Sequence, residues 1–207
     1  MLPYDSITKE RNILTAAWKW RGERKTSSIT IHPKRPADDK HIVKKLLDLF
    51  HEADAVVAHY GDKFDIRYVL TRSIFHGFPP PPNVQQIDTY KIAKNKFLFN
   101  SNRLDYLGKF LGVGRKIKTD VSLWDGCMEG NPSAIRKMEK YNKQDVELLS
   151  DVYEALAPYS HIKQKVLKTA PQCGNCGGRM TNQGTRKMAN GVVYSRYQCK
   201  DCGRWGK

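Results

Sequence analysis

The sequence predicts an α/β fold followed by a small cysteine-rich unit. Short apolar runs that suit strands alternate with longer stretches whose apolar residues recur at helical spacing, which is the pattern of a layered α/β domain. Apolar residues make up 40% of the 207 residues, enough for a packed core. The composition shifts near residues 168–171, so we expect one domain over residues 1–168 and a small one over residues 171–207.

The first half of the chain predicts a strand hairpin, two helices and one buried strand. In order, the expected elements are strands at residues 13–20 and 27–31, a helix at 38–50, a strand at 55–58 and a helix at 63–75. Asp38 or Asp39 is placed to cap the first of these helices. The run Ala55–Ala58 is wholly apolar, which predicts a strand with both faces covered.

The second half of the α/β region predicts a further strand and further helices. Four prolines at residues 79–82 form a stiff connector, and residues 84–90 suit a short strand. Asn102 is placed to cap a helix. Asn131-Pro132 combines a capping residue with proline at the first helical position, and the helix that follows should reach about Leu156.

Two CxxC pairs near the end of the chain predict a zinc ribbon. The four cysteines are Cys173, Cys176, Cys199 and Cys202. Four thiolates from two tight turns suit a tetrahedral zinc ion, and Asn190-Gly191 between the pairs favours a hairpin turn. A thioredoxin-like redox motif needs only one pair and explains this spacing less well. The fifth cysteine, Cys127, is interpreted as a buried apolar residue.

The chain is strongly basic, with a formal net charge of +15 and a pI near 9.6, which favours a polyanion such as nucleic acid as partner. The candidate nucleic-acid contacts surround the cysteines and are Arg179, Arg186, Lys187, Arg196, Lys200, Arg204 and Trp205. Cations of this kind neutralise phosphates, and an aromatic ring can stack on a base. The alternative is that these charges only solvate the ribbon while its aromatic residues fill the core, as we expect for Tyr197.

The sequence also bears on the cellular setting. No segment approaches the roughly 18 apolar residues that a membrane span needs. The first residues lack the charged-then-apolar pattern of a signal peptide. Cysteines in CxxC pairs fit metal binding in a reducing compartment better than a disulfide framework. We therefore expect a cytoplasmic protein without a membrane partner.

Two acidic motifs carry the candidate chemistry. The first reads HYGDKFD and ends at Asp65, which follows a strand at the edge where α/β sheets hold ligands, with Phe64 expected to point inward. The second reads YNKQD and places Tyr141 and Asp145 on one face of a helix. A carboxylate on a core-facing stripe is costly unless it is paired or bound to metal. The alternatives are a helix-start carboxylate for Asp65 and a satisfied buried carboxylate for Asp145.

These motifs resemble those of the ribonuclease H-like 3′→5′ exonucleases with four metal-binding acids (DEDD), in the tyrosine subtype and especially in phage and bacterial members. The resemblance covers residues 13 to about 160 and implies a ribonuclease H-like mixed sheet flanked by helices. It implies that Asp65, Tyr141 and Asp145 are catalytic, that Asp65 and Asp145 bind Mg²⁺ or Mn²⁺, and that Tyr141 orients the attacking water. The implied substrate is DNA, with RNA as the other option.

The same resemblance implies a biological process, a protein partner and a cellular location. The activity would release nucleoside monophosphates from a 3′ end during replication, repair or recombination. The expected protein partner is a replication or recombination protein, and the expected location is the cytoplasm of a bacterial or phage-infected cell.

The sequence departs from this family in two places. Tyr60 stands where the first motif quoted above usually has asparagine. The family also carries an Asp-x-Glu pair on an N-terminal central strand, and residues 1–58 contain no such pair. Three explanations compete: an N-terminally shortened enzyme, which we favour, a strand supplied by a partner or second copy, or loss of catalysis with binding kept. The alternative function is therefore a non-catalytic nucleic-acid-binding protein.

Overall fold

The structure is a computed structural model, and it describes residues 10–160, 173, 175–187 and 193–206. The chain divides into two compact units, Met1–Ile162 and Lys163–Lys207. The boundary expected at residues 168–171 lies outside the described residues. Each unit has its own strands and its own core, and each is described by itself.

The first unit has the mixed α/β fold that the sequence predicts. Its elements are β1 (Thr15–Trp18), β2 (Ser27–Thr30), α1 (Lys40–Glu52), β3 (Ala55–Ala58), α2 (Asp65–Phe75), β4 (Gln85–Asp88), α3 (Thr89–Lys96), α4 (Leu104–Phe110), α5 (Val121–Met128), α6 (Pro132–Leu156) and a 3₁₀ turn η2 (Ala157–Tyr159). Strands β1 and β2 pair antiparallel, whereas β3 and β4 pair parallel. No hydrogen-bonded strand joins the two small sheets within the described residues.

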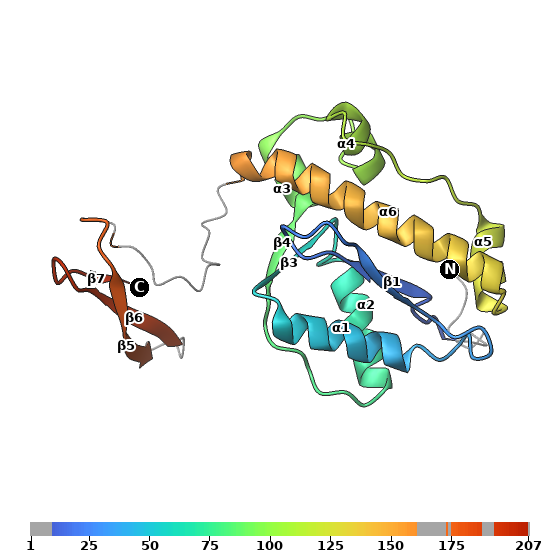
Figure 1. Cartoon of the computed structure of the whole chain (residues 1–207), viewed down its shortest axis with the longest axis horizontal. Helices are drawn as coiled ribbons and strands as arrows, with labels where there is room; N and C mark the ends of the chain where they lie inside the picture. The colour runs from blue at the N-terminus through green and yellow to red at the C-terminus, as the bar shows by residue number, and fades with distance from the viewer. Residues whose placement is uncertain (1–9, 161–172, 174, 188–192, 207) are drawn as a thin grey trace. The chain divides into compact units, whose positions relative to one another are not determined.

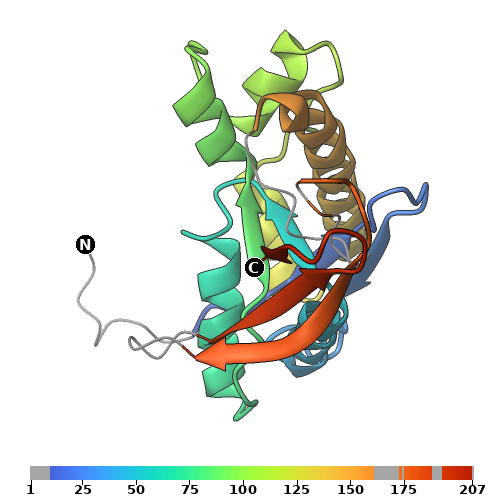
Figure 2. The same cartoon turned by 90° about the vertical axis from the view of Figure 1, so that its left-hand side faces the viewer.

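Helix α6 is the element that connects the two sheets. It runs along the strands on the side opposite to α1 and α2, as both views show (Figure 1, Figure 2). Near its start, Ile135 and Met138 pack into a core with β1, β2 and α5. Near its end, Leu148 and Val152 pack into a second core with β4, α3 and α4. The middle of the helix, which carries the second acidic motif, therefore lies between two apolar cores.

The predicted start and end of α6 are confirmed. The side chain of Asn131 accepts hydrogen bonds from the backbone N–H groups of Ser133 and Ala134, and Pro132 is the first helical residue. This arrangement satisfies N–H groups that would have no partner inside the helix. The helix ends at Leu156, as expected.

Strand β3 differs from its expectation. All four of its residues are only half-buried, although the sequence AVVA predicts burial on both faces. Ala55 and Val57 do pack against the core formed with Ile87. The difference arises because β3 pairs with β4 along one edge and has no strand on its other edge within the described residues.

Two further expectations about helix starts are wrong. Phe64 does not point inward, because 62% of it is exposed just before α2. Asn102 does not cap α4, whose capping position is Arg103, without a side-chain hydrogen bond to the helix. Local sequence indicates where a helix begins, but neighbouring elements decide which side chains its first turn buries.

Asp39 occupies the capping position of α1, but its side chain makes no hydrogen bond to that helix. Its fully buried carboxylate instead accepts hydrogen bonds from the backbone N–H of Ile13 at 2.8 Å, from Arg72 at 2.7 and 2.8 Å, and from His76 at 2.6 Å. One carboxylate therefore joins the segment that leads into β1, the start of α1 and the end of α2.

The second unit is a three-stranded antiparallel sheet in the order β5 (Met180–Lys187), β6 (Val193–Cys199) and β7 (Trp205–Gly206), drawn in orange to red in Figure 1. Tyr197 packs on the small core of this unit, as expected. The predicted turn at Asn190-Gly191 lies outside the described residues, although β5 and β6 pair on either side of it.

Candidate functional site

The first acidic motif lies at the carboxyl end of the parallel pair. Ala58, the last residue of β3, is paired in register with Asp88, the last residue of β4. The chain then turns through Gly61 into α2. A side chain at Gly61 would come within 2.3 Å of the Cβ of Ala58 and 3.6 Å of Oδ2 of Asp65, so glycine lets this carboxylate approach the strand end.

Asp65 begins α2 and stands at this edge, as the sequence predicts. The residue is open to solvent, yet protein atoms surround its carboxylate closely enough that burial raises its pKa. The negative charge of Asp88 raises this pKa further, and the positive charge of Lys116 opposes the rise. Asp65 therefore shares its surroundings with an acid and a base that lie far away in the sequence.

Tyr141 and Asp145 lie together in the middle of α6. Lys116, from the segment between α4 and α5, places its Nζ 2.6 Å from Oδ2 of Asp145 and donates a hydrogen bond to the Tyr141 hydroxyl. Burial alone would lower the pKa of Lys116, but these two hydrogen bonds outweigh it and the pKa is raised. The lysine is therefore a firmly charged partner for the second motif.

Burial raises the pKa of the Tyr141 hydroxyl, an effect that the hydrogen bond with Lys116 opposes. The ring of Tyr141 also lies under the lysine, with Nζ 5.4 Å from its centroid. Tyr141 thus stays a neutral hydroxyl beside a carboxylate and an ammonium group at neutral pH.

Asp88 is a further acid of this site, and it lies in neither of the two acidic motifs. It is buried, and its Oδ1 accepts hydrogen bonds from the backbone N–H groups of Tyr60 and Tyr90, both at 2.9 Å. Its Oδ2 has no hydrogen-bond partner within the described residues. The available signal was its position, because the carboxyl ends of two parallel strands meet at one sheet edge.

Unpartnered buried oxygens concentrate on the segments that form this site. Within the described residues, the buried side-chain atoms that lack a hydrogen-bond partner are Asp62 Oδ1, Asp88 Oδ2, Asn102 Oδ1, Asn142 Oδ1 and Asp145 Oδ1. All five are acceptors, and carboxylate and amide oxygens are the ligands that Mg²⁺ and Mn²⁺ prefer. The donors therefore fit a hard divalent cation in kind.

These acids offer suitable ligand atoms, but they do not form a closely spaced ligand group. Within the described residues, only the four cysteines form a group of three or more potential metal ligands with all ligand atoms within 4.8 Å of one another. Asp65, Asp88 and Asp145 do not form such a group. Their carboxylates belong to one electrostatic neighbourhood, centred on Lys116, without being gathered around a single point.

His59 completes this neighbourhood. A ring nitrogen, Nδ1, lies 2.9 Å from the Thr89 hydroxyl, and burial lowers the pKa of the imidazole. The backbone carbonyl of Asn102 and the charge of Asp88 oppose this effect, whereas Lys116 adds to it. His59 is therefore a neutral side chain at physiological pH, held by the first residue of α3.

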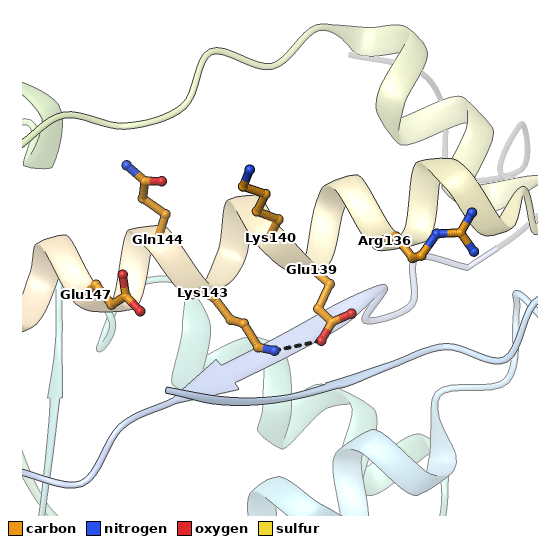
Figure 3. Close-up of a pocket in the computed structure, with 6 residues that line it drawn as sticks. All are labelled: Arg136, Glu139, Lys140, Lys143, Gln144 and Glu147. Atoms are coloured by element: carbon orange, nitrogen blue, oxygen red, sulfur yellow. Dashed lines mark ion pairs between the residues drawn. The ribbon is translucent and has the colours of Figure 1, made fainter. Parts of the chain in front are cut away.

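The other face of α6 carries a hollow of about 360 Å³, shown in Figure 3. Its lining residues are Arg136, Glu139, Lys140, Lys143, Gln144 and Glu147. Glu139 and Lys143 form an ion pair at 2.9 Å, while Lys140 and Gln144 point to the opposite side of the helix. The lining mixes both signs of charge and includes neither Tyr141 nor Asp145, so this hollow is separate from the carboxylate site.

The four predicted cysteine ligands meet in the second unit. The Sγ atoms of Cys173 and Cys202 are 3.5 Å apart, as are those of Cys176 and Cys199. Backbone N–H groups of Cys176 and Asn175 lower the pKa of the Cys173 thiol to about 6. Four sulfurs so close together, with one thiol readily ionised, can hold a metal ion such as zinc.

Of the predicted nucleic-acid contacts, Arg179, Lys200 and Arg204 are exposed around the cysteine cluster. The guanidinium of Arg196 lies over the ring of Trp205, with its carbon 4.1 Å from the centroid, and Trp205 is 50% exposed. The side chains of Arg186 and Lys187 lie outside the described residues.

The fold and these two sites define an α/β protein with an acidic site at a sheet edge and a second unit whose four clustered cysteines can hold a metal ion. A family model of the RNase_H superfamily matches residues 6–157, and the chain belongs to this superfamily. A search of curated proteins finds no match. The superfamily suggests a nuclease or a nucleic-acid-binding role and the use of divalent metals.

Over the part of the chain that the structure describes, no helix is both long enough and apolar enough to cross a membrane.

Proposed function

We propose that this protein is a metal-dependent 3′→5′ exonuclease of the DEDD class, tyrosine subtype, acting on DNA or, as the other option, on RNA. One observation carries the proposal. Lys116 forms an ion pair with Oδ2 of Asp145, its positive charge also acts on the pKa of Asp65, and Oδ1 of Asp145 is buried without a hydrogen-bond partner among the described residues. A buried carboxylate oxygen without a partner, beside a cation that acts on both motif acids, supports a metal site in this place.

In this proposal each residue has a defined task. Asp65 and Asp145 hold Mg²⁺ or Mn²⁺, with the free Oδ1 of Asp145 available as a ligand. When bound, the metal activates water and stabilises negative charge on the scissile phosphate. Tyr141 is a neutral hydroxyl beside Asp145 and orients the water. Asp88 contributes the second unpartnered carboxylate oxygen at this edge.

The second unit supports substrate binding in this scheme. Residues 163–207 contain ten lysines and arginines and one acid, Asp201, so this unit carries much of the positive charge of the chain. We assign a structural Zn²⁺ to its four cysteines and a nucleic-acid contact to its basic residues and Trp205, with a replication or recombination protein as an alternative partner. The cellular setting proposed is the cytoplasm of a bacterial or phage-infected cell.

The test is degradation of a single-stranded oligonucleotide with a label on its 3′ nucleotide, with Mg²⁺ or Mn²⁺ added. We expect release of the labelled mononucleotide, and loss of this release by at least about a hundredfold in Asp145→Ala, because one metal ligand commonly supplies several kcal/mol of charge stabilisation. Asp151→Ala removes an exposed acid from the same helix and should leave the rate unchanged. Release that persists in Asp145→Ala would contradict the proposal.

A second candidate function is non-catalytic nucleic-acid binding. The ion pair between Lys116 and Asp145 favours it, because the lysine already neutralises a carboxylate that a metal would need. This function predicts oligonucleotide binding that weakens steeply with salt, without degradation at any metal concentration. Mg²⁺-dependent label release that Asp145→Ala abolishes would exclude it.

A further inference from the structure

Tyr60 has an unusual backbone conformation. Its φ is +66°, and no other described residue except glycine has a positive φ. This left-handed region is unfavourable for a bulky aromatic residue. The backbone is held there by its neighbours, because the Tyr60 N–H donates to Asp88 Oδ1 at 2.9 Å and the Tyr60 carbonyl accepts from Lys63 and Phe64, each at 3.2 Å.

The ring of Tyr60 is not part of the hydrophobic core. Tyr60 is 47% exposed, although it lies two residues after the end of β3, within the first acidic motif. Its ring lies edge-to-face with Tyr90, with centroids 5.0 Å apart, and Tyr90 in turn contacts His59 at 5.8 Å. An aromatic side chain is therefore supported from behind and open to solvent in front, at the rim of the carboxylate site.

Stability does not explain the choice of tyrosine here. Asparagine and glycine adopt a positive φ at lower cost, and neither would expose an apolar ring. Strained residues that the surrounding structure holds in place are typical of ligand sites.

We propose that the Tyr60 ring, backed by Tyr90, is a stacking surface for a nucleobase of a single-stranded nucleic acid that enters the carboxylate site. The proposal rests on the proposed function, since it names how the substrate strand is held. Every base has a π-face, so such a surface accepts any sequence. The backbone N–H groups of Tyr60 and Tyr90 both donate to Asp88 Oδ1, and Tyr60 precedes Gly61, where an added Cβ would lie 3.6 Å from Oδ2 of Asp65, so a base stacked on these rings is adjacent to the acidic edge.

The test compares three full-length variants in binding a short fluorescent oligothymidylate without added divalent metal. Tyr60→Asn retains a residue suited to positive φ and removes the ring, so binding should weaken by roughly 5- to 150-fold, the range of one base–aromatic stack. Tyr60→Phe keeps the ring and should bind within about twofold of the wild type. Tyr60→Gly should weaken binding as Tyr60→Asn does.

Thermal stability should not fall in the variants whose binding weakens. Because asparagine and glycine relieve the unfavourable φ, the melting temperatures of Tyr60→Asn and Tyr60→Gly should equal or exceed that of the wild type. Lower melting temperatures in both variants would assign the ring to the fold and overturn the proposal. Photocrosslinking with an oligonucleotide that contains 5-iodouracil should attach to Tyr60 or Tyr90, which separates this surface from Trp205 of the ribbon.

The two proposals fail differently. If the wild-type chain binds no oligonucleotide, both the proposed function and the stacking surface are wrong. If the wild type binds and Tyr60→Asn binds equally well, with crosslinks elsewhere, only the stacking surface is wrong. Crosslinks at Tyr60 together with weakened binding in Tyr60→Asn support both.

Discussion

Lys116 pairs with Asp145, and its positive charge also acts on the pKa of Asp65. Burial disfavours a charged lysine, and its hydrogen bonds to Asp145 and Tyr141 keep it protonated. Its positive charge also opposes the rise in the pKa of Asp65 that burial and the neighbouring charge of Asp88 cause. A divalent ion at Asp145 has to compete with this lysine.

Replacing Lys116 should therefore strengthen metal binding. In Lys116→Met the Mn²⁺ affinity should rise by roughly tenfold or more, because a hydrogen bond to a charged group contributes about 1.5–3 kcal/mol that the metal no longer has to displace. Electron paramagnetic resonance of free Mn²⁺ measures this affinity directly. Lys118→Met changes an exposed lysine two residues away and should have no effect. Equal affinities in the wild type and Lys116→Met would show that Asp145 is not a ligand.

At the scale of elements, the Asp39 carboxylate joins segments that are distant in sequence. Burial opposes its ionisation, but hydrogen bonds from Arg72, from the backbone of Ile13 and from His76 outweigh that effect, and the pKa of Asp39 is lowered. A carboxyl group with a depressed pKa stabilises the folded state above its ordinary pKa of about 3.9 and loses this contribution as pH falls through the depressed value.

Replacing Arg72 should destabilise the folded protein, because the Asp39 carboxylate would stay buried. Arg72→Met should lower the free energy of unfolding at pH 7 by about 3–5 kcal/mol, because Asp39 is left as a buried charge without its ion-pair partner. The difference from the wild type should narrow as the pH falls below about 4, since protonated Asp39 needs no cation. Urea denaturation across this pH range measures both effects.

The control for this variant is Arg67→Met, which removes an exposed arginine from the same helix and should change the free energy of unfolding by less than about 0.5 kcal/mol. A similar loss in both variants would mean that the ion pair with Asp39 is not the cause.

Elements with strong local signals could be predicted from the sequence. Asn131-Pro132 and the apolar spacing that follows set the start and length of α6, because capping and helical periodicity are properties of neighbouring residues. The half-burial of β3 could not be predicted, since it depends on which strands lie beside it. For the same reason local sequence placed Phe64 inside, whereas the structure exposes it.

The residues of the candidate site likewise divide into those that the sequence predicted and those that it did not. Asp65, Tyr141 and Asp145 were found because their motifs are local, and their roles stay predictions. Lys116 was not found, because nothing near residue 116 indicates that the segment between α4 and α5 reaches the middle of α6. The left-handed φ of Tyr60 was likewise not visible, since it depends on the hydrogen bond to Asp88.

At the scale of the whole molecule, the two units depend on different sources of stability. The first has apolar cores that include Leu107, Val152 and Leu156. Among the described residues of the second unit, the buried core consists of Cys173, Met180 and Cys199, with Tyr197 packed against them. So small a core does not hold a sheet together without a further constraint, so the second unit should fold only when its cysteines bind metal.

Disrupting the cysteine cluster should therefore affect one unit and spare the other. Cys199→Ser should lower the zinc content from one equivalent to well below half, measured by atomic emission, and should remove the protection of β5 and β6 amides from hydrogen exchange. The melting temperature of the first unit should stay within about 2 °C of the wild type, because its cores do not include these residues.

Cys127→Ser is the matched control: it replaces a buried cysteine of the first unit and should lower that unit's stability while leaving zinc at one equivalent. Full zinc content in Cys199→Ser, or protected β5 and β6 amides after chelation, would mean that the four sulfurs meet for a reason other than binding a metal.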